Sequence, residues 1–272
     1  MSRNAQRKQI LMCAPDHFGV AYVINPWMEG QYARTDADEA RRQWLGLKAL
    51  IESRADVRLV PPHPGLPDLV FTANAGLPKG KTIVLSRFRC PERRGEEPVF
   101  RAWFEAEGYR VIDPPNDLPF EGAGDALYDE ARDLFWVGHG FRSHEDVAPF
   151  LEKTLATRTV SLGLIDPRFY HLDTCLCPLP GGSLLYFPGA FAPASRAAIE
   201  AHVPPEKRIC VEGPDAENFC CNAVALDGAV IFNRASASLI ERLRQAGFEP
   251  LLTPLDQFIK AGGAAKCLTL EI

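Results

Sequence analysis

Residues 109–138 read YRVIDPPNDLPFEGAGDALYDEARDLFWVG and contain most of one structural unit. The apolar segment YRVIDPP (109–115) predicts a short strand that stops at paired prolines, which cannot continue a sheet. The segment FEGAGD (120–125) follows and places an acidic residue among glycines. LFWVG (134–138) then predicts a buried strand. The stretch therefore alternates strand, polar loop and strand.

The same order of segments recurs along the chain. Strands that end at a polar residue or proline are predicted at QILMCAP (9–15), VRLVPP (57–62), YRVIDPP (109–115), RICVEGP (209–214) and EPLLTP (249–254). Buried strands are predicted at TIVL (82–85), LFWVG (134–138), LLYFP (184–188) and AVIFN (229–233). An amphipathic helix closes most units, so each unit mixes strands with a helix.

Three of the predicted helices have clear start or stop signals. Asp36 can cap the first, with Glu39 three residues later as in a capping box. Ser143 and Asp146 are expected to begin another helix. A third is expected to end at Gly247, since glycine favours the position just beyond a helix.

A polar residue occupies a comparable place in each unit. These residues are Asn25, Asn74, Glu121, His171, Asn218 and Cys267, which stand 49, 47, 50, 47 and 49 residues apart. Repeats of this length indicate stacked or radially arranged units. A unit of strands and a helix fits a ring of ββαβ modules with the helices outside. Similar α/β units that recur by chance would also give inexact spacing, so the spacing alone leaves both interpretations open.

Composition and charge exclude several classes of protein. The chain has 272 residues, 46% hydrophobic and 24% charged, with a net charge of −5, which is typical of a globular protein. Basic residues occur only in short groups, so nucleic-acid binding is not expected. No segment approaches the ~18 apolar residues of a membrane span. The start, MSRNAQRKQILMCAPDH, has too short an apolar run for a signal peptide, so a cytoplasmic location is expected.

The eight cysteines are expected to be reduced thiols, because no CxxC pair or secretory signal is present. Neither CLC (175–177) nor CC (220–221) has the spacing of zinc ligands, and GHG (138–140) lacks a second ligand at helical spacing. We therefore expect no metal. A homo-oligomer is compatible with the composition.

Cys267, in AGGAAKCLTLEI (261–272), is the first candidate for chemistry. Small residues before it allow a backbone or ligand to approach closely, and it is expected at the start of a final strand. It also keeps the spacing of the repeat. The alternative is a small buried apolar residue, as for the seven other cysteines.

His171 and Glu121 are the other candidates. In FYHLDT (169–174), Asp173 would lie on the same face of a strand as His171, although a structural histidine is the alternative. Glu121 is unusual for a strand. The alternative for it is a turn, with Asp125 as a solvated turn residue. Cysteine, histidine and glutamate on three units could act as nucleophile, acid–base and orienting group.

At these positions the chain resembles the guanidine-modifying enzymes of the pentein superfamily, which include dimethylarginine dimethylaminohydrolases, arginine deiminases and amidinotransferases. The resemblance extends over nearly the whole chain. It rests on PDLVFTANAG (67–76), RRGE (93–96), FEGAGD (120–125), GFRS (140–143), FYHLDT (169–174) and GGAAKC (262–267). It implies an α/β fold, a five-bladed ββαβ propeller with pseudo-fivefold symmetry, as one catalytic domain over residues 1–272 with a central, cofactor-free site.

The resemblance also implies roles for individual residues. Cys267 would attack the guanidinium carbon and form an S-alkylthiouronium, His171 would act as general acid–base, and Glu121 would be its hydrogen-bond partner. The expected substrate is a small cationic guanidino compound. The substrate-binding residues are expected to be Arg93 and Arg142 for the α-carboxylate, Asp173 for the guanidinium, and Asn25, Asn74 and Asp125 along the site.

One departure narrows the resemblance. The chain has Ala73 and Asn74 where dimethylarginine hydrolases have two acids and deiminases have an arginine and an aspartate. With MCAPDHFGVAYVINPWM (12–28), this looks like the arginine dihydrolase branch, which converts arginine to ornithine, carbon dioxide and two ammonia molecules. The alternatives are dimethylarginine hydrolysis, arginine deimination, amidino transfer and a non-catalytic ribosome-binding pentein.

Overall fold

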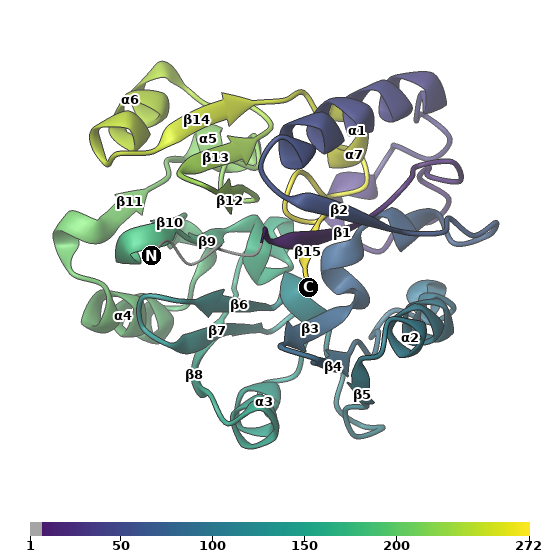
Figure 1. Cartoon of the computed structure of the whole chain (residues 1–272). Helices are drawn as coiled ribbons and strands as arrows, with labels where there is room; N and C mark the ends of the chain where they lie inside the picture. The colour runs from purple at the N-terminus through teal and green to yellow at the C-terminus, as the bar shows by residue number, and fades with distance from the viewer. Residues whose placement is uncertain (1–6) are drawn as a thin grey trace, which may run out of the picture.

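The chain folds into five three-stranded sheets arranged around a common centre (Figure 1). The computed structural model describes residues 7–272. Residues 1–6 lie outside the described part. They belong to the segment MSRNAQRKQILMCAPDH, from which no signal peptide was predicted. Each sheet has a first strand antiparallel to a middle strand, and a third strand parallel to the middle one. The predicted ring of ββαβ modules is confirmed.

The sheets are β15–β1–β2, β3–β4–β5, β6–β7–β8, β9–β10–β11 and β12–β13–β14. The strands are β1 (Gln9–Cys13), β2 (Asp56–Val60), β3 (Gly76–Lys79), β4 (Thr82–Leu85), β5 (Arg110–Ile112), β6 (Ala126–Asp129), β7 (Leu134–His139), β8 (Arg158–Gly163), β9 (Leu176–Pro178), β10 (Leu184–Tyr186), β11 (Arg208–Cys210), β12 (Val224–Leu226), β13 (Ala229–Phe232), β14 (Glu249–Leu252) and β15 (Leu270–Glu271). The predicted buried strands are the middle strands β4, β7, β10 and β13.

The helices that connect middle and third strands lie at the periphery of the ring (Figure 1). They are α1 (Ala37–Glu52), α2 (Glu96–Ala106), α3 (Val147–Leu155), α4 (Pro193–His202) and α6 (Ala237–Gln245). Two shorter helices, α5 (Gly213–Glu217) and α7 (Asp256–Ile259), lie in loops. Within residues 7–272, no helix combines the length and apolarity that a bilayer crossing requires.

Local signals fix the helix ends. Asp36 caps α1 by accepting a hydrogen bond from the Glu39 backbone N–H at 3.0 Å, and Gly247 follows α6 with φ of 89°, as predicted. The prediction for Ser143 is wrong. The helix α3 begins at Val147 after Asp146, and the Ser143 hydroxyl bonds to other residues.

The ring closes by pairing the two ends of the described chain. Leu270 of β15 pairs with Leu11 of β1, and Ile272 N–H donates to the Gln9 carbonyl at 2.9 Å. Apolar clusters then join neighbouring sheets, for example Leu11 with Val84 of β4. The last residues are therefore held inside the first sheet, and the turns that precede the first strands meet at the centre.

Candidate active site

A small, partly open cavity lies where these turns converge. Its lining includes six residues that the sequence singled out: Asn25, Asn74, Arg93, Arg142, His171 and Cys267. Three predicted site residues do not line it: Glu121, Asp125 and Asp173. Glu121 contacts His171, Asp173 contacts Cys267, and Asp125 contacts Leu172, the residue after His171. The cavity therefore has a lining layer and a buried carboxylate layer behind it.

Glu121 and His171 occupy equivalent places in neighbouring modules. Each lies directly before a short 3-10 helix, Gly122–Gly124 after Glu121 and Leu172–Thr174 after His171, which leads into the first strand of the sheet. This equivalence explains their spacing. The predicted strand through His171 and Asp173 is wrong, because both residues belong to this turn.

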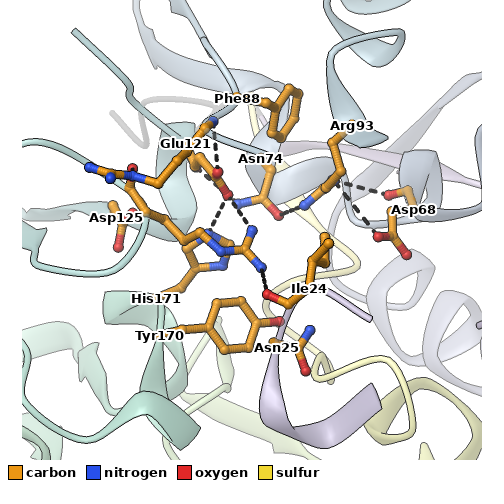
Figure 2. Close-up of polar contacts among 12 residues, drawn as sticks. Ile24, Asn25, Asp68, Asn74, Phe88, Arg93, Glu121, Asp125, Tyr170 and His171 are labelled. Atoms are coloured by element: carbon orange, nitrogen blue, oxygen red, sulfur yellow. Dashed lines mark hydrogen bonds and ion pairs between the residues drawn. The ribbon is translucent and has the colours of Figure 1, made fainter. Parts of the chain in front are cut away.

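Glu121 accepts hydrogen bonds from two sides (Figure 2). Its Oε2 lies 2.7 Å from His171 Nε2 and 2.9 Å from Arg142 Nη1, and both its neighbours are buried. Burial alone would raise the pKa of Glu121, but the Arg142 guanidinium and the His171 hydrogen bond hold that pKa below its ordinary value. An ionised carboxylate only accepts, so His171 donates through Nε2. The imidazole is thereby oriented, and Nδ1 is left to exchange protons.

Asp125 does not line the cavity, but its hydrogen bonds hold the backbone next to Glu121 and His171. Its Oδ2 accepts from the Ser143 hydroxyl at 2.7 Å and its Oδ1 from the Leu172 backbone N–H at 3.0 Å. The same hydroxyl accepts from the Glu121 backbone N–H at 3.0 Å. The alternative of a solvated turn residue is wrong, because the side chain is buried, and substrate contact by Asp125 stays a prediction.

Cys267 lies in a turn before β15, and the expectation of a strand start is wrong. Its thiol lies 3.3 Å from Asp173 Oδ2, to which it donates, and receives a hydrogen bond from Asn222 Nδ2 at 3.0 Å. Burial, followed by the charge of Asp173, raises the pKa of this thiol well above its ordinary value. The resting sulfur is therefore protonated at neutral pH.

The glycines before Cys267 are required by close contacts. A Cβ added at Gly262, whose φ is +83°, would meet the Tyr170 hydroxyl oxygen at 2.7 Å. One added at Gly263 would meet Phe71 Cε1 at 2.5 Å. The close backbone approach that the sequence suggested for this segment is observed.

Two buried carboxylates each have an oxygen with no hydrogen-bond partner within residues 7–272: Asp173 Oδ1 and Asp68 Oδ1. Burial raises the pKa of Asp173 to about 7 and also raises that of Asp68. Asp68 lines the cavity, and its Oδ2 accepts from the Tyr22 hydroxyl at 2.9 Å. Buried polar atoms are normally paired, so these oxygens favour a bound cation.

Sequence reasoning missed Asp68. The residue stands in PDLVFTANAG (67–76), where it is the acid of an otherwise largely apolar segment. An acidic residue in an apolar segment was the feature that could have identified Asp68 as a site residue.

The two arginines are held by internal acids. Arg93 forms a two-pronged ion pair with Glu96, in which Nε and Nη2 each donate at 2.8 Å. Its Nη1 donates to Asn74 Oδ1 at 2.9 Å (Figure 2). Arg142 donates to Glu121 and to the Ile24 carbonyl, and its guanidinium carbon lies 4.6 Å from the centre of the Tyr170 ring. Of the two arginines, Arg142 commits fewer donors to the protein.

Neighbours fix the orientation of the Asn74 carboxamide. Its Oδ1 accepts from Arg93, while Nδ2 donates one hydrogen to the Glu121 carbonyl at 2.9 Å. A primary amide carries a second N–H. Asn74 lines the cavity, and within residues 7–272 its Nδ2 makes one hydrogen bond.

Of the regularly spaced residues, only Glu121 and His171 share one structural position, and Asn74 lies inside its 3-10 helix, Thr72–Ala75. Asn25 follows a middle strand, where its Oδ1 accepts from Trp27 and Met28 backbone N–H groups and its Nδ2 donates to the Ala261 carbonyl. Asn218 is half-buried and donates to Pro214. The residue of that module that reaches the site is Asn222, which the sequence did not single out.

The sequence matches one family model and several known enzymes. The family model described as "N,N dimethylarginine dimethylhydrolase, eukaryotic" matches residues 31–272. The chain is 56% identical over 264 residues to the bifunctional arginine dihydrolase/ornithine cyclodeaminase ArgZ of Synechocystis sp., with 97% of this chain and 37% of the relative covered. It is 38% identical over 271 residues to the N(G),N(G)-dimethylarginine dimethylaminohydrolase of Mycobacterium tuberculosis, with 99% and 87% covered. The chain thus spans little more than a third of ArgZ.

Solved structures agree on the fold. The cyanobacterial ArgZ N-terminal domain, as a cysteine-to-serine variant bound to substrate, superimposes with a TM-score of 0.96 at 56% identity, covering 97% of each chain. A dimethylarginine dimethylaminohydrolase at 19% identity has a TM-score of 0.82, with 98% of this chain and 100% of that chain covered, which supports the fold alone.

Proposed function

Because the chain belongs to the N,N-dimethylarginine dimethylhydrolase family of pentein guanidine-modifying enzymes, we propose that it hydrolyses arginine to ornithine, carbon dioxide and two ammonia molecules. The ArgZ N-terminal domain, described as an arginine dihydrolase, supports this assignment because it is matched over 97% of its length. The assignment of dihydrolysis to this chain also depends on Asn74.

One observation carries the proposal. The thiol of Cys267 and the imidazole of His171 share a cavity that also exposes Asp68, while Asp173 touches the thiol from behind. The two unpartnered carboxylate oxygens suit a substrate with two cationic groups. Arginine has both: its guanidinium would lie beside Asp173 and its α-ammonium beside Asp68. Arg142 and Arg93 would then bind the α-carboxylate.

The bound cation would also activate the nucleophile. A guanidinium ~4 Å from the sulfur, at an effective dielectric constant of ~20, stabilises the thiolate by about 4 kcal/mol, or roughly 3 pK units. Such an attraction offsets the burial that keeps the resting thiol protonated. Cys267 would therefore ionise when substrate binds, and this makes its reactivity selective for cations.

In the first hydrolysis, the Cys267 thiol passes its proton to His171, the thiolate attacks the guanidinium carbon, and His171 returns that proton to the departing ammonia as the carbon–nitrogen bond breaks. The product of this step is an S-alkylthiouronium. His171 then accepts a proton from water, the water oxygen bonds to the same carbon, and the carbon–sulfur bond breaks. Citrulline and the free cysteine result.

The second hydrolysis repeats this sequence on citrulline. The thiolate attacks the ureido carbon and expels the second ammonia, which leaves an S-carbamoyl cysteine. Water releases a carbamate, which decomposes to ornithine and carbon dioxide. Asn74 would retain citrulline because its second N–H can donate to the neutral ureido oxygen, which a carboxylate cannot do.

Product analysis tests the proposed function. Purified protein with arginine should yield ornithine and two ammonia molecules per arginine consumed. Citrulline as the sole amino-acid product would contradict dihydrolysis and indicate a deiminase.

The family model favours a second candidate, hydrolysis of dimethylarginine to citrulline and dimethylamine. The same assay, run with dimethylarginine, separates the two functions. If dimethylamine is released from dimethylarginine faster than ammonia is released from arginine, dimethylarginine is the preferred substrate.

Replacement of Asn74 by aspartate is expected to shift the product of arginine turnover towards citrulline. The variant loses the N–H that would bind the ureido oxygen and also places a carboxylate oxygen against the Glu121 carbonyl, 2.9 Å away in the native protein. We expect the ornithine-to-citrulline ratio to fall at least tenfold, roughly the effect of one lost hydrogen bond in a buried site. Chromatography of both amino acids measures it, and Asn218→Asp is the control. An unchanged ratio would remove Asn74 from the second hydrolysis.

A further inference from the structure

Asn222, in the turn before β12, uses its whole carboxamide around Cys267. Its Oδ1 accepts from the backbone N–H groups of Ala264, at 3.1 Å, and Cys267, at 3.2 Å. Its Nδ2 donates to the Asp173 carbonyl at 3.1 Å and to the Cys267 sulfur at 3.0 Å. The side chain is completely buried. A primary amide has two donors and two acceptor sites, so these contacts fix its orientation.

We propose that Asn222 is a further catalytic residue, whose Nδ2–H stabilises the Cys267 thiolate as it forms and attacks the substrate. The inference rests on the proposed function and adds a residue to it. A hydrogen bond to an ionised sulfur is stronger than one to a thiol, so this donor favours the thiolate over the resting state. The donor is in place before substrate arrives and needs no rearrangement.

The surroundings of the sulfur show why such a donor matters. Asp173 lies 3.3 Å from the sulfur on another turn, and its negative charge opposes ionisation of the thiol. Within residues 7–272, the other titratable groups that line the cavity are Asp68, Arg93, Arg142, Tyr170 and His171. The positive charge of Lys266 acts on Asp173. A bound guanidinium would neutralise the effect of Asp173, whereas Asn222 acts on the sulfur directly. Two independent effects then favour the thiolate.

The same amide also sets the position of the sulfur. Because Oδ1 holds two backbone N–H groups of the turn and Nδ2 holds the side chain, the backbone and sulfur of Cys267 are bound to one rigid group. The contact to the Asp173 carbonyl joins this turn to the module that carries His171. Asn222 thus connects the nucleophile with the acid–base module.

The variant Asn222→Asp keeps the size of the side chain and an acceptor for the Ala264 and Cys267 N–H groups, but it loses both N–H donors. It also places a carboxylate beside the sulfur, so its effect is compared with that of Asn222→Ser, which adds no charge. Asn218→Asp, four residues earlier in the same segment, is the matched control, because within residues 7–272 that side chain bonds only to the Pro214 carbonyl. Asn222→Ser, which retains one hydroxyl donor, provides the same comparison if the aspartate variant does not fold.

Two measurements are made on folded protein. Arginine turnover should show kcat reduced about 10- to 100-fold, with KM within about threefold, the effect of one lost hydrogen bond to a charged atom. Alkylation of Cys267 by 2-chloroacetamidine, followed by intact mass, should slow at least about tenfold at pH 7. Its rate–pH profile should move to higher pH, and a shift in the same direction in the uncharged Asn222→Ser variant would be due to lost donation and not to the added charge. The serine variant should lie between the native protein and the aspartate variant.

Alkylation of folded Asn222→Asp at the native rate across the pH range would overturn the inference, as would a kcat within threefold of the control. The alkylation measurement does not depend on arginine turnover. Failure of the native protein to hydrolyse arginine would therefore refute the proposed function while leaving the effect of Asn222 on the thiol measurable.

Discussion

Replacement of Cys267 by alanine is expected to lower kcat for arginine by at least about 10⁴-fold, the order of loss when a covalent nucleophile is removed. Both proposed hydrolyses pass through a bond to this sulfur, so ornithine and citrulline should disappear together. The fold should survive, because the change removes one small atom from a site where Asn222 still holds the backbone N–H. Ammonia release and thermal unfolding provide the measurements.

Cys210→Ala is the matched control, since that thiol is exposed on β11 and lies outside the cavity lining. It should retain native turnover. More than about one per cent of native activity in Cys267→Ala would mean that water attacks the substrate directly, and the covalent mechanism would have to be abandoned.

Replacement of His171 by alanine is expected to lower kcat for arginine by about 10³-fold, within the usual range for a general acid–base. The imidazole is buried, oriented by Glu121 at 2.7 Å, and shares the cavity with the nucleophile. Without it, ammonia must leave unprotonated and water must attack without a base. Turnover should therefore stop at both stages, with substrate binding retained.

An arginine analogue with a methylthio leaving group tests the assignment of His171 more sharply. Methanethiolate leaves without protonation, so His171→Ala should still form the S-alkylthiouronium once per enzyme but should not hydrolyse it. Intact-mass spectrometry should then show a stable adduct on Cys267. Native protein should turn over the analogue. Rapid hydrolysis of the adduct by the variant would assign the base to another residue.

The repeat was predictable from the sequence because its strongest signals are local. The middle strands are short, fully apolar runs such as TIVL at β4, and Asp36 caps α1 as its position indicated. The first strands were harder to predict: β15 spans only Leu270–Glu271, and its pairing with β1 depends on closure of the ring. A strand that short has no periodicity to detect.

The sequence indicated which residues to consider for the candidate site, but it did not indicate the contacts that they make. Glu121 and His171 lie at equivalent turns, which accounts for the regular spacing between them. Spacing then favoured Asn218, whereas Asn222 contacts the sulfur, because Phe219 adopts a left-handed φ of 59° that redirects the chain between them. Such a turn leaves little trace in the sequence.

The roles of the carboxylates depended on burial, which the sequence could not give. Asp125 was predicted to be a solvated turn residue or a substrate-binding residue, and its carboxylate is buried and accepts hydrogen bonds from Ser143 and Leu172. Asp68 was overlooked because one acid beside apolar residues usually faces solvent. Its unpartnered oxygen became visible only with the fold.

Ionisation of the Cys267 thiol by a bound cation is the central claim, and paired alkylation measures it most directly. The rates of labelling at pH 7 by 2-chloroacetamidine, which carries the amidinium charge, and by neutral 2-chloroacetamide are compared on the native protein. We expect the cationic reagent to react with Cys267 about 10²- to 10³-fold faster than the neutral one, beyond their ratio towards a free thiol, which corresponds to the attraction of about 4 kcal/mol. Equal rates, or preferential labelling of any other cysteine, would contradict the account.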